Sequence, residues 1–119
     1  MALYRFLDTS FQGIQDGALY GNSVSIDKNR ALVGLPYYDI SYGAVFFYNF
    51  SEITQTWVFD SSFKGEDSWG NFGWSVAIDN SKAIVGVPDY DNSNGAVYFY
   101  TYAEDTSWVF NCSFQEINN

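Results

Sequence analysis

Histidine is absent from this sequence of 119 residues, and cysteine occurs once, as Cys112. Without histidine, the chain lacks the usual general base near neutral pH and the commonest metal ligand. A single cysteine excludes an internal disulfide and a zinc site built from cysteines. The sequence also has no Gly-rich phosphate loop that ends in Lys-Ser or Lys-Thr. We therefore expect no catalytic residues, no enzymatic activity and no cofactor.

Basic residues and long apolar runs are also scarce. Lys and Arg total 5 against 14 Asp and Glu, and the net charge of -9 argues against a nucleic-acid partner because polyanions would be repelled. The longest apolar runs, such as residues 44–48, fall far short of the roughly 20 residues that span a bilayer, so we expect no membrane insertion. No signal peptide is evident. This predicts a cytoplasmic location if the chain is complete, and leaves an extracellular one open if it is a fragment.

Aromatic residues are abundant instead. They make up 21% of the chain, hydrophobic residues make up 47%, and charged residues only 16%. A disordered chain would show the opposite balance. Leucine occurs five times and methionine once, which argues against a helical bundle. The composition indicates a compact, acidic protein rich in β-structure.

The chain contains an internal repeat. Residues 20–50 align with residues 72–102 at an offset of 52 without a gap, and 17 of the 31 aligned positions are identical. A third element occurs three times, at residues 5–11, 57–63 and 108–114. The chain therefore holds two full units, at residues 14–65 and 66–119, preceded by an extra copy of the last element within residues 1–13.

Each unit is expected to form four short strands. In the first unit the apolar runs and turn signals place them at residues 23–26, 30–35, 43–50 and 56–63, with antiparallel neighbours joined by hairpins. Both alternating faces of these strands are apolar, so each sheet should be covered on both sides. Small repeated sheets stacked around an axis meet this need. We therefore predict an all-β fold of β-propeller blades, two per chain, with one extra N-terminal strand.

Three motifs occur in the same order in both units. The first unit has Tyr20 to Asp27, Val33 to Pro36 and Gly43 to Tyr48, and the second has the matching segments within residues 72–100. In this combination the chain resembles the FG-GAP repeat of the integrin α-subunit propeller. The resemblance implies four-stranded blades, with the Phe-Gly segment entering the inner strand and the Gly-x-Pro segment ending the second.

The resemblance departs from the family at its calcium loop. Many FG-GAP repeats place this loop between the first two strands, but here residues 27–30 and 79–82 are short and end in a cation. Calcium requires six to eight oxygen ligands. Residues 89–95 are richer in oxygens, but their Gly falls at the seventh position instead of the sixth and no Glu stands at the twelfth. We expect no metal in either unit.

The segments that follow the second strand are interpreted as structural turns. Here Asp39 and Asp91 are expected to cap local N–H groups, and Gly43 and Gly95 to adopt a positive φ. The turn residues repeated in both units are Pro36, Pro88, Asp39, Asp91, Gly43 and Gly95.

Aromatic residues that do not repeat are the candidates for recognition. Trp69 and Trp74 align with Gly17 and Asn22 and lie in the connection between the units. An aromatic residue in a connecting loop can anchor a ligand, and the alternative is packing on a neighbouring blade or subunit. The weaker candidates are Tyr37 and Tyr42.

Two units are too few for a closed propeller, which has about four to eight blades. We expect open blade faces that expose Phe46, Phe47, Phe99 and Tyr100, and a homo-oligomer of three or four chains that completes a ring of six or eight blades. The expected function is a non-enzymatic module for protein interaction or self-assembly. Two alternatives stay open: a carbohydrate-binding, lectin-like propeller with a glycan ligand, and a fragment of a longer FG-GAP propeller of the adhesion type.

Overall fold

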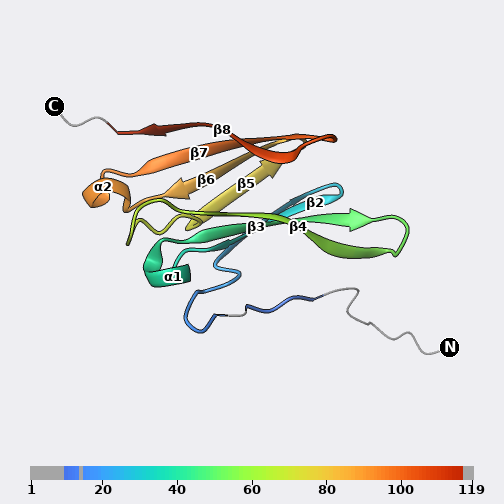
Figure 1. Ribbon diagram of the computed structural model, residues 1–119, viewed down its shortest axis with the longest axis horizontal. Helices are drawn as coiled ribbons and strands as arrows, with labels where there is room; N and C mark the ends of the chain where they lie inside the picture. Colours follow the sequence, from blue (N-terminus) through green and yellow to red (C-terminus); the bar gives the residue numbers. More distant parts are fainter. Residues whose placement is uncertain (1–9, 14, 117–119) are drawn as a thin grey trace.

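The computed structural model describes residues 10–13 and 15–116, which fold into two four-stranded sheets (Figure 1). The first sheet consists of β1 Ser23–Asp27, β2 Arg30–Leu35, β3 Ala44–Ser51 and β4 Thr56–Lys64. The second consists of β5 Ser75–Asp79, β6 Lys82–Val87, β7 Ala96–Ala103 and β8 Ser107–Gln115. Two short helical turns, α1 Tyr38–Ser41 and α2 Tyr90–Ser93, connect the second and third strands of each sheet.

The strands of each sheet follow one another in sequence order, and every neighbouring pair is antiparallel. The predicted all-β class and the four-stranded antiparallel units are confirmed, with strand ends that differ from the expected ones by at most a residue. The repeat extends to irregularities of the sheets. The register between the third and fourth strands shifts after Phe47 in the first sheet and after Phe99, its repeat equivalent, in the second.

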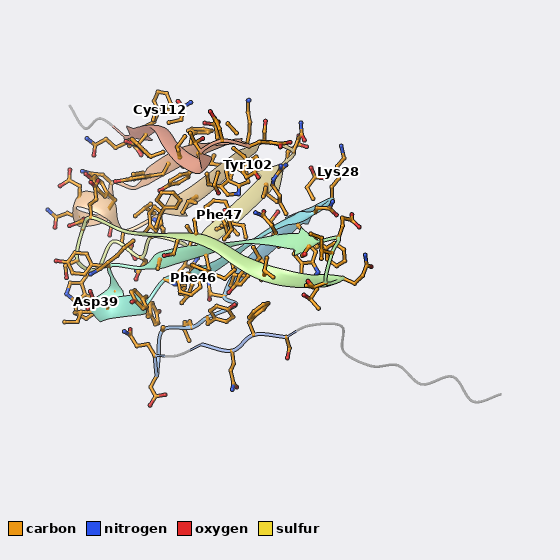
Figure 2. All side chains as sticks on the ribbon, turned by 45° about the vertical axis from the view of Figure 1, so that its right-hand side comes forward. Lys28, Asp39, Phe46, Phe47, Tyr102 and Cys112 are labelled. Atoms are coloured by element: carbon orange, nitrogen blue, oxygen red, sulfur yellow. The ribbon has the colours of Figure 1, made fainter. Side chains whose placement is uncertain are left out.

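The two sheets stack face to face (Figure 1). Aromatic side chains pack in the core between them. The ring of Phe47 stacks on Trp108 with centroids 4.4 Å apart, and Phe63 lies 4.5 Å from Tyr100. Figure 2 shows Phe47 between the two sheets and Phe46 on the opposite side of the first sheet. The core therefore lies between the sheets, at the faces that they turn toward each other.

One expectation about the open faces is wrong. Phe47 and Tyr100 are fully or almost fully buried, because they face each other between the sheets with ring centroids 6.0 Å apart. Neighbouring residues on a strand point to opposite faces, so only Phe46 and Phe99 of the expected set lie on faces turned away from the other sheet. Both are half-buried.

The segment before β1 lies against the first sheet, on the side away from the second sheet (Figure 1). Most of the predicted extra N-terminal strand falls in residues 1–9, outside the described residues, and residues 10–13 are not in a strand. Phe11 packs on Tyr48 at a centroid distance of 4.7 Å, and Tyr20 packs on Phe46 at 5.9 Å. Among the described residues, no helix has the length and apolar character needed to cross a membrane.

Candidate functional site

The helical turns α1 and α2 have an unusual backbone. Three successive residues in each, Asp39 to Ser41 and Asp91 to Ser93, have φ between 51° and 69°. Non-glycine residues rarely adopt this left-handed region, and a β-branched residue such as Ile40 least of all. Gly43 and Gly95 close the turns with φ of 84° and 86°, as the sequence predicts. Both turns lie at the same end of the stacked sheets (Figure 1).

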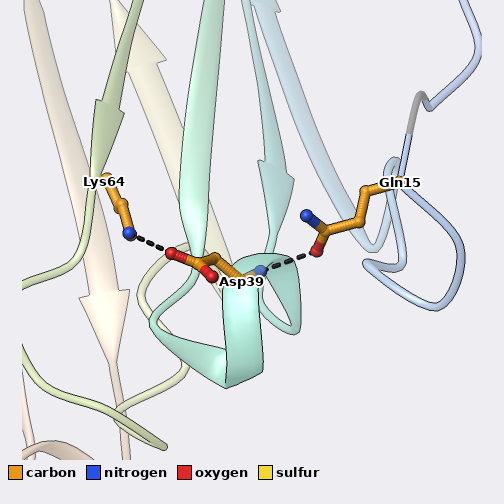
Figure 3. Close-up of polar contacts among 3 residues, drawn as sticks. All are labelled: Gln15, Asp39 and Lys64. Atoms are coloured by element: carbon orange, nitrogen blue, oxygen red, sulfur yellow. Dashed lines mark hydrogen bonds and ion pairs between the residues drawn. The ribbon is translucent and has the colours of Figure 1, made fainter.

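Asp39 differs from its expected role, whereas the Asp91 carboxylate accepts from a local N–H, that of the Asn94 side chain, at 3.3 Å. The carboxylate of Asp39 pairs with Lys64, and its backbone N–H donates to Gln15 Oε1 at 2.7 Å (Figure 3). The backbone N–H of Asp91 likewise donates to Asp67 Oδ2 at 2.8 Å. In each turn the capping group therefore comes from the segment that enters the sheet, because the left-handed turn directs this N–H outward. The polar contact at these positions holds the entering segment to the turn.

A polar cavity of about 590 Å³ opens beside α2. Trp69 forms part of its wall, with 64% of its surface exposed and a φ of 68°. The Asn71 amide donates to Asp89 at 2.5 Å across this region. The other residues that line the cavity are Asp67, Ser68, Asp91, Asn92 and Ser93.

The second tryptophan of the connection lies apart from this cavity. Trp74 is 43% exposed, and its ring centroid lies 6.2 Å from that of Tyr37, which follows β2 of the first sheet. Two of the candidate aromatic residues are therefore brought together, in a contact between segments of the two repeats. Tyr42 is half-buried under the Lys64 ammonium, which lies 4.7 Å from the ring centroid.

The two repeated prolines differ in their surroundings. Pro36 is fully buried, whereas Pro88 is exposed and lines an apolar groove of about 450 Å³ on the second sheet. Both follow the last residue of a strand, where a missing N–H costs no ladder bond. The difference arises because the second sheet covers the first at this position, while within residues 10–13 and 15–116 no further sheet covers the second.

The groove beside Pro88 belongs to one of two open apolar faces, which we define by their residues. The outer face of the first sheet points away from the second sheet, and the outer face of the second sheet points away from the first. The first is formed by Val24, Ile26, Val33, Phe46, Tyr48 and Phe59. The second is formed by Ser75, Ala77, Ile84, Val97, Phe99 and Phe114.

Three buried tyrosines are held in their neutral form: Tyr48 lies on the outer face of the first sheet, and Tyr98 and Tyr100 lie between the two sheets. Burial, then the hydrogen bond with Tyr20, raises the pKa of Tyr48 well above its usual range. Burial, then a 2.9 Å hydrogen bond to Glu66, raises the pKa of Tyr98, and burial chiefly raises that of Tyr100. These shifts follow from aromatic packing and set no residue apart as an acid or base.

No metal centre is formed by the part of the chain that the structure describes, because no three His, Cys, Asp or Glu side chains there are grouped to hold an ion. Two carboxylates of the polar cavity accept hydrogen bonds from nearby N–H groups, whereas the buried Asn71 Oδ1 has no hydrogen-bond partner among the described residues. Asp67 accepts from the Asp91 N–H, and Asp91 accepts from the Asn94 amide at 3.3 Å.

Comparison with known families identifies the second repeat. Residues 66–100 match the model of the FG-GAP repeat, which confirms the resemblance found in the sequence. The matched segment runs from the connection after β4, through β5, β6 and α2, into β7. No curated protein matches the chain.

Proposed function

Because residues 66–100, which include β5 and β6, match the FG-GAP repeat, we propose that the chain is a non-enzymatic β-propeller module that works by stacking its open blade faces against further blades. Each four-stranded sheet is one blade in this account. Three or four copies then complete a ring of six or eight blades, within the range of closed propellers.

The exposed outer face of the first sheet carries this proposal. Val24 and Ile26 of β1 are 67% and 64% exposed, and with Phe59 they extend an apolar surface across the sheet. Contiguous apolar surface of this kind on a soluble protein marks an interaction site. Such a surface also suits a protein partner, because association is driven by the burial of apolar area.

The test is a charge placed on this face. Ile26→Asp introduces a carboxylate on a side chain that is already mostly exposed, so the free chain should still fold. Ile53→Asp is the matched control, because Ile53 is 95% exposed in the turn between β3 and β4 and lies on neither outer face. We expect sedimentation to show oligomers for the wild type and for Ile53→Asp, and monomers for Ile26→Asp. A monomeric wild type at all concentrations would contradict the proposal.

A carbohydrate ligand is the second candidate function, and Trp69 favours it. An exposed indole beside Asp67, Asn71 and Asp89 combines a stacking surface with hydrogen-bonding groups, as sugar recognition requires. Glycan-array binding that is lost in Trp69→Ala and retained in Trp74→Ala would support this function. Absence of binding by the wild-type chain to every glycan would remove it.

A further inference from the structure

Equivalent residues of the two repeats have opposite burial. Leu32 and Phe47 of the first sheet are 0% exposed, whereas their equivalents in the second sheet, Ile84 and Phe99, are half-buried. The reverse holds on the other side of each sheet. Ile78 of the second sheet is 8% exposed, whereas its equivalent Ile26 in the first sheet is 64% exposed. Each of these repeat positions therefore carries a side chain suited to burial between sheets. Within one chain, only one of the two equivalent residues is buried there.

The two outer faces are consequently equivalents of the two faces that already pack together. The outer face of the second sheet carries the same repeat positions with which the first sheet packs against the second sheet. The outer face of the first sheet carries the same repeat positions with which the second sheet packs against the first sheet. In one chain these outer faces point in opposite directions, so they can meet only between two molecules.

We propose that two copies of this chain stack head to tail. The outer face of the second sheet of one copy packs on the outer face of the first sheet of the other copy. The residues pair across this contact as their repeat equivalents pair between the two sheets of one chain. This inference rests on the proposed function and specifies its partner and polarity. A head-to-tail contact joins two different surfaces, so it repeats in one direction and forms a ring when the rotation closes.

Hydrogen bonds within the chain predict those between copies. Ser23 Oγ donates to the Gly73 carbonyl at 3.0 Å, and the Asp27 carboxylate accepts from the Asn80 N–H. The equivalents of the side chains, Ser75 and Asp79, are the same residue types at the same positions of the second sheet. In the stacked copy their partners are the Gly21 carbonyl and the Lys28 N–H. The bond that Ser25 Oγ accepts from the Ile78 N–H has no counterpart, because Ala77 replaces the serine.

A glycine supports the same register. A Cβ at Gly34 would lie 2.1 Å from the Gly73 carbonyl oxygen, so the close approach of the two sheets requires glycine there. Gly86 is the equivalent in the second sheet, and its φ lies outside the left-handed range. A Cβ at Gly86 would lie 2.3 Å from Ser75 Oγ, as one at Gly34 would lie 2.4 Å from Ser23 Oγ, but the nearest backbone atom, the Ser75 carbonyl oxygen, is 3.7 Å away. The Gly21 carbonyl of a stacked copy supplies the missing close approach.

Aromatic contacts carry over in the same way. Trp108 stacks on Phe47 within the chain, so Trp57 of one copy is placed on Phe99 of the next. The Arg30 guanidinium lies 3.6 Å from the Tyr102 ring centroid. The equivalent pair between copies is Lys82 over Phe50, a cation on an aromatic ring once more.

The N-terminal segment already occupies its own part of this interface. Phe11 packs on Tyr48 at 4.7 Å, as its equivalent Phe63 packs on Tyr100 at 4.5 Å. The Tyr37 N–H donates to the Ala18 carbonyl at 3.1 Å, as the Asp89 N–H donates to the Gly70 carbonyl at 3.1 Å. The segment thus follows the path of the connection between the two sheets. A second copy would supply β5, β6 and β7 as the inner strands of a preceding blade, and Phe114 of its β8 would reach the position that Phe11 holds on Tyr48.

Cysteine crosslinking tests the polarity and the register together. In a Cys112→Ser background, Ala77→Cys and Ile26→Cys are made in separate chains. Their positions in two stacked copies correspond to Ser25 and Ile78 within one chain. A mixture of the two variants, oxidised and run on a non-reducing gel, should give a crosslinked dimer that is absent from either variant alone. The matched control, Ser25→Cys with Ile78→Cys in one chain, should give a crosslink within the monomer.

The outcomes separate this inference from the proposed function. A wild-type chain that sediments only as a monomer contradicts the proposed function and the inference with it. Oligomers whose mixed variants give no crosslink, while the control crosslinks, contradict the head-to-tail register alone. Crosslinks formed by Ala77→Cys alone or Ile26→Cys alone would show like faces in contact and would also overturn it.

Discussion

Phe47 and Phe99 occupy the same position of the repeat and differ in what covers them. Phe47 is fully buried between the sheets, and Phe99 lies half-buried on the outer face of the second. Replacing a buried phenylalanine by alanine removes apolar contacts and leaves a cavity, which costs about 3–5 kcal/mol. We expect this loss in the free energy of unfolding for Phe47→Ala, measured by urea denaturation of dilute protein.

Phe99→Ala is the matched variant at the other face. In dilute solution its loss of stability should be clearly smaller than that of Phe47→Ala, because fewer contacts are removed. Its association, measured by sedimentation at higher concentration, should be lost. Equal losses of stability in the two variants, together with unchanged association of Phe99→Ala, would contradict the role assigned to the outer face.

Tyrosine ionisation predicts how stability depends on alkaline pH. The pKa values of Tyr48, Tyr98 and Tyr100 are raised from the ordinary 10.0, because burial disfavours the phenolate. The folded chain therefore holds protons that the unfolded chain releases above about pH 10. The stabilisation from neutral tyrosines is complete below that pH and decreases as the pH rises beyond it.

The measurement is urea denaturation at several values between about pH 8 and pH 12. We expect stability to fall above about pH 10, and to fall less steeply in Tyr100→Phe, which keeps the ring and removes one titrating hydroxyl. Tyr37→Phe, at an exposed residue, is the control. The same slope in wild type and Tyr100→Phe would show that this hydroxyl does not contribute.

Residue roles were harder to predict from the sequence than the repeat itself. The patterns around Phe47 and Phe99 are almost the same, so the sequence could not show which of the two is buried. That depends on which neighbour each sheet has. The role of Asp39 was also missed, because its N–H is capped by Gln15, 24 positions away, and no local turn pattern indicates such a partner. The alignment of Gln15 with Asp67 is the signal that could have revealed it.

At the scale of elements, the eight strands in the described part of the chain could be predicted almost completely from the sequence. Apolar runs bounded by Pro36 and by the polar turns fix where the strands begin and end, and the repeat doubles the evidence for each. The helical turns α1 and α2 were expected only as turns. Their three successive left-handed residues have no composition signal, since Ile40 and Asn92 occupy the same position.

The N-terminal segment gives a prediction at this scale. Phe11 packs on Tyr48 in the same way as Phe63 packs on Tyr100. Phe114 is the repeat equivalent of Phe11 and Phe63. In a stacked pair, Phe114 of one copy would pack on Tyr48 of the other, at the position that Phe11 holds. Strand β8 is already paired with β7 in its own chain, so we expect Phe11 to be displaced. Phe11→Ala should therefore strengthen association, seen as a lower dissociation constant in sedimentation.

The control for this prediction is Phe114→Ala, which should weaken association. Weaker association in Phe11→Ala would contradict displacement. It would mean that the N-terminal segment itself takes part in the contact between copies.

At the scale of the whole molecule, the chain is a stack of two sheets with unlike ends. The length of 119 residues corresponds to two repeat units and an extra element, and aromatic side chains such as Phe47, Tyr100 and Trp108 fill the core between the sheets. Repeats of this kind become stable by stacking on neighbours. The outer face at each end of the stack carries repeat positions that are buried in the other sheet, so further copies are needed to bury them.

The mass of the assembled particle distinguishes a closed ring of several copies from a single chain. Light scattering coupled to size exclusion should give three or four times the chain mass of 13.5 kDa, about 40 or 54 kDa, because head-to-tail stacking ends when a ring of six or eight blades closes. A folded, soluble particle of 13.5 kDa at every concentration would contradict assembly into a ring.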